Sequence, residues 1–232
     1  MRILALIAAR GGSKRIPEKN TRLLGASPLI TWSIEVAKGI CEICDILVST
    51  DDPVIAEVAR GAGALVPWLR PAELATDTAT SVNVCLHALD WYEGAHGIID
   101  GLLLLQPTSP FRSRSTVLRG IDLFRVNKHR PVLAVSPAAS HPMWCFRIQD
   151  QSLRPFFEEV ATLRSQDLPA AYVVNGSFYL IAPADLRTLR SFMSDNTIPL
   201  VIEDPRESID IDSEWDWKIA ETFLAMNNAG RT

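Results

Sequence analysis

Residues 9–20 read ARGGSKRIPEKN and place four cations and two glycines directly after an apolar run. The cations could neutralise an anion, and glycine lets a backbone turn closely enough for its N–H groups to face one. The stretch matches neither GxxxxGKS/T nor GxGxxG, so it predicts no kinase-type phosphate loop or dinucleotide fingerprint. It predicts another form of phosphate-binding loop; the alternative is a solvated basic loop. The residues are Arg10, Gly11, Gly12, Lys14, Arg15 and Lys19.

The stretch SIDIDSEWDW carries two closely spaced aspartates, Asp210 and Asp212. If residues 208–212 form a strand, both carboxylates lie on one face, with Ile209 and Ile211 toward the core. Neighbouring carboxylates repel unless a cation joins them, and Mg²⁺ usually binds one or two carboxylates together with substrate phosphates. The pattern indicates a metal site; in the alternative, Asp212 or Ser213 only caps the final helix.

A third cluster, QPTSPFRSRS, follows the strongest apolar run of the chain, at residues 101–106. Two prolines fix the turn, and Ser113 or Ser115 could cap the next helix. Gln106, at the carboxyl end of the run, offers a neutral donor and acceptor to a cleft. The same residues are also consistent with a plain turn between a strand and a helix, so the ligand role of Gln106 is a hypothesis.

Strand-length apolar runs alternate with helical periodicity over the first 136 residues, which predicts an α/β fold with a doubly wound, mostly parallel sheet. In such sheets ligands gather at the carboxyl ends of the strands, where the basic loop would lie. We expect one domain over residues 1–232, with an excursion from the core at approximately 138–171. The predicted strands cover 3–9, 46–50, 64–66, 101–106 and 132–136, three more follow within 175–212, and the last helix runs from 213 to about 227.

Composition excludes several functional classes. The 232 residues carry a net charge of −4, with 47% hydrophobic and 22% charged residues, which is typical of a soluble globular protein. The acidic balance gives no extended basic face for nucleic acid, and no apolar run is long enough for a membrane span or a secretory signal, so we expect a cytoplasmic protein. Cys41 and Cys44 have the spacing of a zinc pair, but no second pair completes the site, which favours small hydrophobic roles.

Taken in order, the motifs resemble those of the acylneuraminate cytidylyltransferases, the CMP-sialic acid synthetase group. The resemblance covers nearly the whole chain, and its first and fourth motifs are specific when they occur together. It implies a Rossmann-like nucleotidyltransferase fold in which residues 138–171 form a dimerisation segment. The matching stretches are IAARGGSKRIPEKN, GASPLITWSIEVA, VSTDD, RPAELATDTATS, LLLLQPTSPFR, RSQDLP, NGSFYLI and SIDIDSEWDW.

This resemblance implies that the anomeric hydroxyl of a nonulosonic acid attacks the α-phosphorus of CTP and releases pyrophosphate. Arg10, Lys19, Asp210 and Asp212 would be catalytic, the two aspartates carrying Mg²⁺. The nucleotide site would comprise Arg10 and Lys19 at the triphosphate, Asn20 and Ser81 at the ribose and Arg70 near the base, together with Gly11 and Ser13. Gln106 and Asn175 would contact the sugar acid, as would Arg164 reaching from the partner subunit of a homodimer.

One departure concerns the acceptor: AYVVNGSFYLI lacks a cation that many relatives carry before NG, so we expect recognition of the sugar acid to differ. Legionaminate, pseudaminate and N-acetylneuraminate all stay open as acceptors, because small differences in pocket shape separate them. Alternatives are a cytidylyltransferase for 3-deoxy-manno-octulosonate or a sugar 1-phosphate, and a non-catalytic nucleotide-binding module. No general base is evident, and a metal that lowers the pKa of the attacking hydroxyl would account for that.

Overall fold

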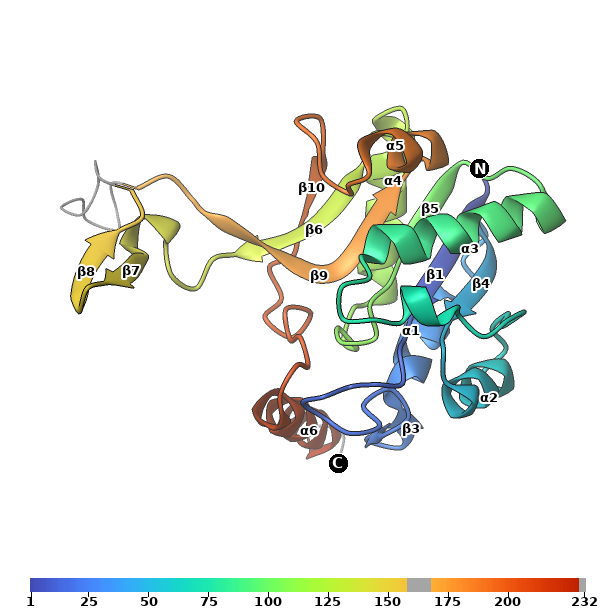
Figure 1. The fold of residues 1–232 in the computed structure, drawn as a ribbon, viewed down its shortest axis with the longest axis horizontal. Coiled ribbons are helices and arrows are strands. Elements are labelled where there is room, and N and C mark those ends of the chain that lie inside the picture. Colours follow the sequence, from blue (N-terminus) through green and yellow to red (C-terminus); the bar gives the residue numbers. More distant parts are fainter. Residues whose placement is uncertain (158–167, 230–232) are drawn as a thin grey trace.

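The structure is a computed structural model that describes residues 1–157 and 168–229. Its centre is a six-stranded sheet in the order β10-β6-β9-β5-β1-β4 (Figure 1). Neighbouring strands are parallel except at β9, which runs antiparallel to both β5 and β6. The strands are β1 (Ile3–Ala8), β4 (Ile43–Ser49), β5 (Gly101–Leu104), β6 (Val132–Pro137), β9 (Tyr172–Ile181) and β10 (Ile198–Val201).

Helices cover both faces of this sheet. Along β1, Ile3, Ala5 and Ile7 pack into one core cluster, while Leu4 and Leu6 pack into the other. The first cluster receives α1, α2 and α4, and the second receives α3 and α5, so each central strand is apolar on both sides. The helices are α1 (Leu29–Ala37), α2 (Pro53–Gly61), α3 (Ser81–His96), α4 (Arg114–Val126), α5 (Pro183–Leu189) and α6 (Glu214–Ala229). The predicted fold class is confirmed.

A third, smaller core joins the two ends of the chain. Ile16 and Leu24 of the segment after β1 pack against Ile211 and Trp217, all of them fully buried. This segment also holds the short strands β2 (Leu23–Leu24) and β3 (Ser27–Pro28), which lie beside α6 in Figure 1. The cluster places the basic loop and the aspartate-containing stretch side by side, although almost two hundred residues separate them.

Two predicted strands are wrong. Residues 208–212 form no strand: the Ile211 amide donates to the Thr108 carbonyl at 2.8 Å, and the segment docks on the loop after β5 instead of extending a ladder. Residues 64–66 contribute only an isolated bridge between Leu65 and Leu47. In both places buried apolar side chains produced a strand-like pattern, and tertiary packing buries them without regular pairing.

The segment between β6 and β9 leaves the sheet. There β7 (Phe146–Gln149) and β8 (Ser152–Pro155) form a hairpin at the end of the long β6 and β9 arms, far from the sheet in Figure 1. Large apolar side chains of this hairpin are exposed, among them Phe146, Ile148 and Leu153. Arg164, the expected contact to a partner subunit, lies outside the described residues. Within residues 1–157 and 168–229, no helix is long and apolar enough to cross a membrane.

We predict that Gly120→Ala destabilises the fold by about 1–3 kcal/mol, because a Cβ there would lie 2.7 Å from Cε1 of the buried Phe178 ring. The matched control is Gly94→Ala on α3, where no atom lies within 4 Å of the added Cβ. Since both glycines are helical, Gly94→Ala should gain about 0.5–1 kcal/mol from propensity alone. Urea unfolding measures both free energies, and equal effects would contradict the packing argument.

Candidate functional site

A basic pocket of about 620 Å³ opens at the carboxyl ends of β1 and β5. All predicted nucleotide-binding residues except Gly11 line it, so the fold brings together side chains from three separate stretches of the chain. This edge of the sheet is where α/β folds bind ligands. The lining includes Arg10, Ser13, Lys14, Arg15, Lys19, Asn20, Arg70, Ser81 and Asp212.

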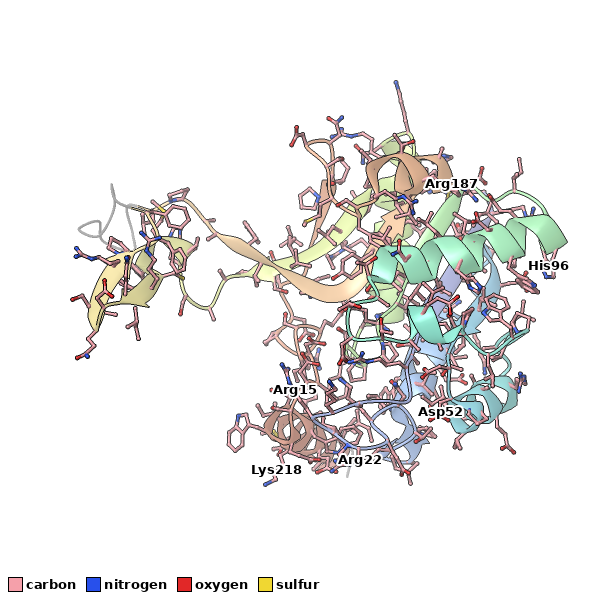
Figure 2. The ribbon with its side chains drawn as sticks, viewed as in Figure 1. Arg15, Arg22, Asp52, His96, Arg187 and Lys218 are labelled. Carbon is pink, nitrogen blue, oxygen red and sulfur yellow. The ribbon has the colours of Figure 1, made fainter. Side chains whose placement is uncertain are left out.

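Lys19 connects the two ends of this pocket. Its ammonium donates to the Ile211 carbonyl at 2.9 Å and to the Asp212 carboxylate at 3.2 Å, and only 13% of its side chain is exposed. Arg15 approaches the other Asp212 oxygen at 3.5 Å, and Arg22 pairs with Glu214 at 2.6 Å. Figure 2 shows Arg15 and Arg22 beside α6, which carries Lys218. The basic loop is thus held by the aspartate-containing segment.

Asp77 forms ion pairs with the other two cations of the basic loop, Arg10 and Lys14. Its carboxylate accepts from Arg10 Nη1 at 2.7 Å and, through its other oxygen, from Lys14 Nζ. These bonds, the one from Lys14 foremost, hold the pKa of Asp77 below its ordinary value. Sequence reasoning missed this residue, although it stands in the motif RPAELATDTATS. The structure therefore places a protein carboxylate where an anionic ligand would compete for the same two cations.

Gly11 does not line the basic pocket, although it was predicted to belong to the nucleotide site. Its amide donates to Asp51 Oδ1 at 3.1 Å, and a Cβ at this position would lie 2.5 Å from Asp52 Oδ2. The amide of Ser13, two residues further on, donates to the Gly11 carbonyl at 2.8 Å. The glycine is required here because the loop packs against β4's continuation, and cation side chains supply the positive charge of the pocket.

Arg70 and Asn20 are both fixed in place. Arg70 is buried and donates through Nε to Ser49 Oγ at 3.0 Å and through Nη2 to the Ser49 carbonyl; burial lowers the pKa of its guanidinium. Asn20 Nδ2 donates to the Arg10 carbonyl at 3.0 Å, which closes the basic loop on itself. Ser81 is the first residue of α3, following the N-cap Thr80. These anchors define the pocket walls before any ligand binds.

A second pocket of about 550 Å³, here called the β9 pocket, adjoins this region. It is lined by Gln106 and Asn175, the described residues predicted to contact the sugar acid, and by Asp210, one of the two predicted metal ligands. Asn175 Oδ1 accepts from the Ser177 amide at 2.9 Å, and its Nδ2 donates to Ser136 Oγ at 3.0 Å. Asn175 is therefore largely engaged inside the protein, whereas Gln106 keeps its side-chain amide toward Gly176.

The wall of the β9 pocket combines apolar side chains with polar ones, the acidic Glu203 included, and among the described residues that line it none is a lysine or arginine. Ala139, Val173, Val174 and Ile202 contribute hydrocarbon surface. Val173 and Val174 stand immediately before NG, where the sequence departs from the pattern of many relatives. The structure shows that this departure faces a pocket.

Asp210 and Asp212 divide between the two pockets instead of sharing one strand face. Asp210 lines the β9 pocket and Asp212 the basic pocket, on either side of the buried Ile211. Burial raises the pKa of Asp210, and the Asp212 charge adds to the rise, while a hydrogen bond with Thr108 opposes it. The two carboxylates therefore interact electrostatically although they line different pockets. Residues 210–212 form the junction between these pockets.

Of the two residues predicted as alternatives for capping the final helix, Ser213 takes that role and Asp212 does not. Asp216 Oδ2 accepts from the amides of Asp212 at 3.1 Å and Ser213 at 2.8 Å, and Ser213 Oγ accepts from the Asp216 amide at 3.3 Å. This reciprocal pattern is a capping box at the start of α6. The Asp212 carboxylate does not cap and points to Lys19.

Comparison with known proteins decides the family. A family model described as Cytidylyltransferase matches residues 4–119. A CMP-N,N'-diacetyllegionaminic acid synthase of Legionella pneumophila is 40% identical over 231 residues, which cover 98% of each chain. The chain belongs to the cytidylyltransferase family. The resemblance inferred from the motifs is thereby confirmed.

One further relative and one solved structure are also similar to this cytidylyltransferase. A pseudaminic acid cytidylyltransferase of Campylobacter jejuni is 30% identical over 234 residues and is covered to 98%, as is this chain. The solved structure of a CMP:2-keto-3-deoxy-manno-octonic acid synthetase complexed with CTP superimposes with a TM-score of 0.72, covering 98% of this chain and 100% of the other, at 14% identity. At that identity the likeness shows a shared fold.

We predict that Asp77→Asn tightens CTP binding about two- to fivefold at low salt, because the Asp77 carboxylate no longer competes with the triphosphate for Arg10 and Lys14. The effect is small because exposed ion pairs contribute little free energy. The matched control is Asp195→Asn, which makes the same charge change at an exposed site outside both pockets. Titration calorimetry with CTP measures both affinities. Weaker binding by Asp77→Asn than by the control would show that Asp77 supports the nucleotide instead of competing with it.

Proposed function

We propose that this cytidylyltransferase joins CMP from CTP to the anomeric hydroxyl of a nonulosonic acid and releases pyrophosphate. The observation that carries the proposal is the junction at residues 210–212, where a basic pocket meets a separate pocket whose described lining has no lysine or arginine. The transfer needs two substrates held with their reacting atoms adjacent, and two adjoining pockets answer that need. The names of the 40% and 30% identical relatives support the acceptor class.

The proposal assigns the nucleotide to the basic pocket. Arg10 and Lys19 neutralise the triphosphate, and Lys14 and Arg15 add positive charge at its open side. Asn20 and Ser81 contact the ribose and Arg70 lies near the base, with Ser13 and the Gly11 turn shaping the loop. Phosphoryl-group transfer needs little covalent help from a protein, so alignment and neutralisation of the departing pyrophosphate are the main tasks of these side chains.

Asp210 and Asp212 fit a divalent cation. Burial raises the pKa of Asp210 and the Asp212 charge adds to the rise, so a cation between the two carboxylates would relieve their repulsion. Among the described residues no group of three or more metal-ligating side chains occurs, which suits Mg²⁺ because it takes its remaining ligands from phosphate oxygens and water. When bound, Mg²⁺ would polarise the phosphate oxygens and lower the pKa of the attacking hydroxyl.

The proposal assigns the sugar acid to the β9 pocket, with Gln106 as its polar contact and Asn175 fixing the wall. Burying hydroxyl groups against Val173 and Val174 without hydrogen bonds would cost free energy, whereas acetamido methyl groups and deoxy carbons lose little water there. We therefore favour an acylated, partly deoxygenated acid of the legionaminic type as acceptor. The 3-deoxy-manno-octulosonate alternative is the less favoured one, because that acid is polyhydroxylated.

The proposal includes a homodimer and a cytoplasmic location. The exposed apolar surface of the β7–β8 hairpin is suited to burial against a second copy of the chain, and exposed patches of this kind mark interaction sites. Arg164 of the partner would then supply the cation that the described wall of the β9 pocket lacks. A cytoplasmic enzyme has direct access to CTP.

The reaction is tested by pyrophosphate release with CTP and Mg²⁺ over a panel of nonulosonic acids, 3-deoxy-manno-octulosonate and sugar 1-phosphates, with ATP, GTP and UTP as nucleotide controls. We expect release with CTP and most efficiently with a diacylated legionaminate. Saturable CTP binding without release from any acceptor would favour the non-catalytic nucleotide-binding module and contradict the proposal.

Lys19→Met should lower kcat/KM at least about 100-fold, because one preorganised charge at the leaving phosphates is removed. The matched control is Lys38→Met, an exposed lysine that pairs with Glu35 at 2.6 Å outside both pockets. Turnover of both variants is compared with that of the wild type at equal folded concentration. Full activity in Lys19→Met would contradict the assignment of the basic pocket.

A further inference from the structure

We infer that Arg112 is a positioning residue that holds Gln106 and an irregular turn of β9 in the geometry that the sugar-acid pocket needs. Arg112 lies in the loop between β5 and α4 and is 4% exposed. Its guanidinium donates to Ser33 Oγ on α1 at 2.7 Å, to the Gln106 carbonyl at 2.5 Å and to the Ser177 carbonyl on β9 at 2.7 Å. One side chain thus ties three elements together. This inference rests on the proposed function of the β9 pocket.

The turn of β9 is the part of the sheet that most needs support. Leu133 of β6 faces Tyr179 of β9, but Val135 faces Val174, so two steps along β6 correspond to five along β9. The additional residues leave the ladder, and bulges of this kind re-aim side chains next to active sites. The same residues, Asn175 and Gly176, line the β9 pocket. The next residue, Ser177, is also outside the ladder, and its amide and carbonyl need partners that the sheet does not supply.

Two side chains supply those partners. Asn175 Oδ1 accepts from the Ser177 amide, and Arg112 donates to the Ser177 carbonyl. On the other side of the turn, pairing between β5 and β9 ends at Leu104 and Tyr179, so no ladder bond connects Gln106 with the turn. The guanidinium of Arg112 makes that connection by holding both carbonyls at once.

The approach of Gln106 to the turn is close. Gly176 has φ +78°, and a Cβ there would lie 2.9 Å from Gln106 Oε1. A small displacement of either element would therefore change the position of the Gln106 amide relative to the pocket. Arg112 itself does not line the β9 pocket, so its effect on an acceptor would be transmitted through Gln106 and the turn.

A buried guanidinium is costly, and a purely structural site would be expected to pair it. Among residues 1–157 and 168–229, Arg112 forms no ion pair with a carboxylate, and its three acceptors are neutral. Burial lowers its pKa to about 9, and the charges of Glu207 and Asp210 oppose that shift, so it stays charged at neutral pH. A planar fork with five donors can bridge several carbonyls in fixed directions, which lysine cannot do.

The test separates positioning from stabilisation by comparing the two substrates. In Arg112→Met and Arg112→Lys we expect KM for the sugar acid to rise about tenfold or more, with calorimetric affinity for CTP within about twofold of the wild type. Ser33→Ala removes one acceptor of Arg112 and the long hydrogen bond, 3.4 Å, from Ser33 Oγ to the Gln106 carbonyl. It should raise the same KM about threefold, so it keeps the test decisive if the Arg112 variants fail to fold. Retention of CTP binding shows that the variants are folded.

The matched control is Arg114→Met, which removes a neighbouring exposed arginine that also holds two main-chain carbonyls, those of Lys38 and Gly39. It should leave the KM values of both substrates unchanged. If Ser33→Ala and any folded Arg112 variant lower only the melting temperature, or raise both KM values equally, the inference is overturned.

Different results refute the inference and the proposed function: one is obtained with the wild type and the other with its variants. A wild type that binds CTP but neither binds nor converts any nonulosonic acid refutes the proposed function, and the inference with it. A wild type that converts an acid, with variants that keep the wild-type KM for that acid, refutes the inference alone.

Discussion

The organisation of this protein depends on the contact that Lys19 makes with Ile211 and Asp212 across almost the full length of the chain. A lysine whose side chain is only 13% exposed must keep the hydrogen-bond partners of its ammonium group, because partial burial makes each lost hydrogen bond costly. The small core of Ile16, Leu24 and Trp217 brings the two segments together, and the capping box at α6 fixes the Asp212 backbone. The charges of the basic loop therefore face the aspartates as a result of apolar packing that lies outside both pockets.

The sequence predicted the parallel part of the sheet well, because strands buried on both faces produce continuous apolar runs such as residues 3–9 and 101–106. It predicted less of β9, whose reversed direction is fixed by long-range pairing with β5 and β6 and leaves no local signal. Residues 208–212 alternate like a strand, yet Ile211 is buried against a loop and a small core. The local sequence pattern indicates which side chains are buried, but it does not indicate which distant element covers them.

Motif reasoning found the side chains that line the pockets but not those that organise them. Arg10, Lys19 and Gln106 were recognisable because charge or amide groups that follow predicted strands indicate binding, whereas Arg70 was predicted only from the resemblance to the family. Arg112 stands in the same QPTSPFR motif as Gln106, but only the structure shows that it is buried and bridges carbonyls. Likewise, the importance of Gly11 was predictable while its reason was not, because Asp51 and Asp52 are forty residues away.

The order in which the chain builds its two pockets has a consequence for redesign. The basic pocket is lined mainly by residues 8–84 and the β9 pocket by residues 106–210, and two short stretches, 106–108 and 210–212, contribute to both. Donor and acceptor recognition are thus written in successive portions of one polypeptide. Substitutions at Val173 and Val174 can therefore change the range of acceptors while the nucleotide-binding pocket keeps its residues and geometry.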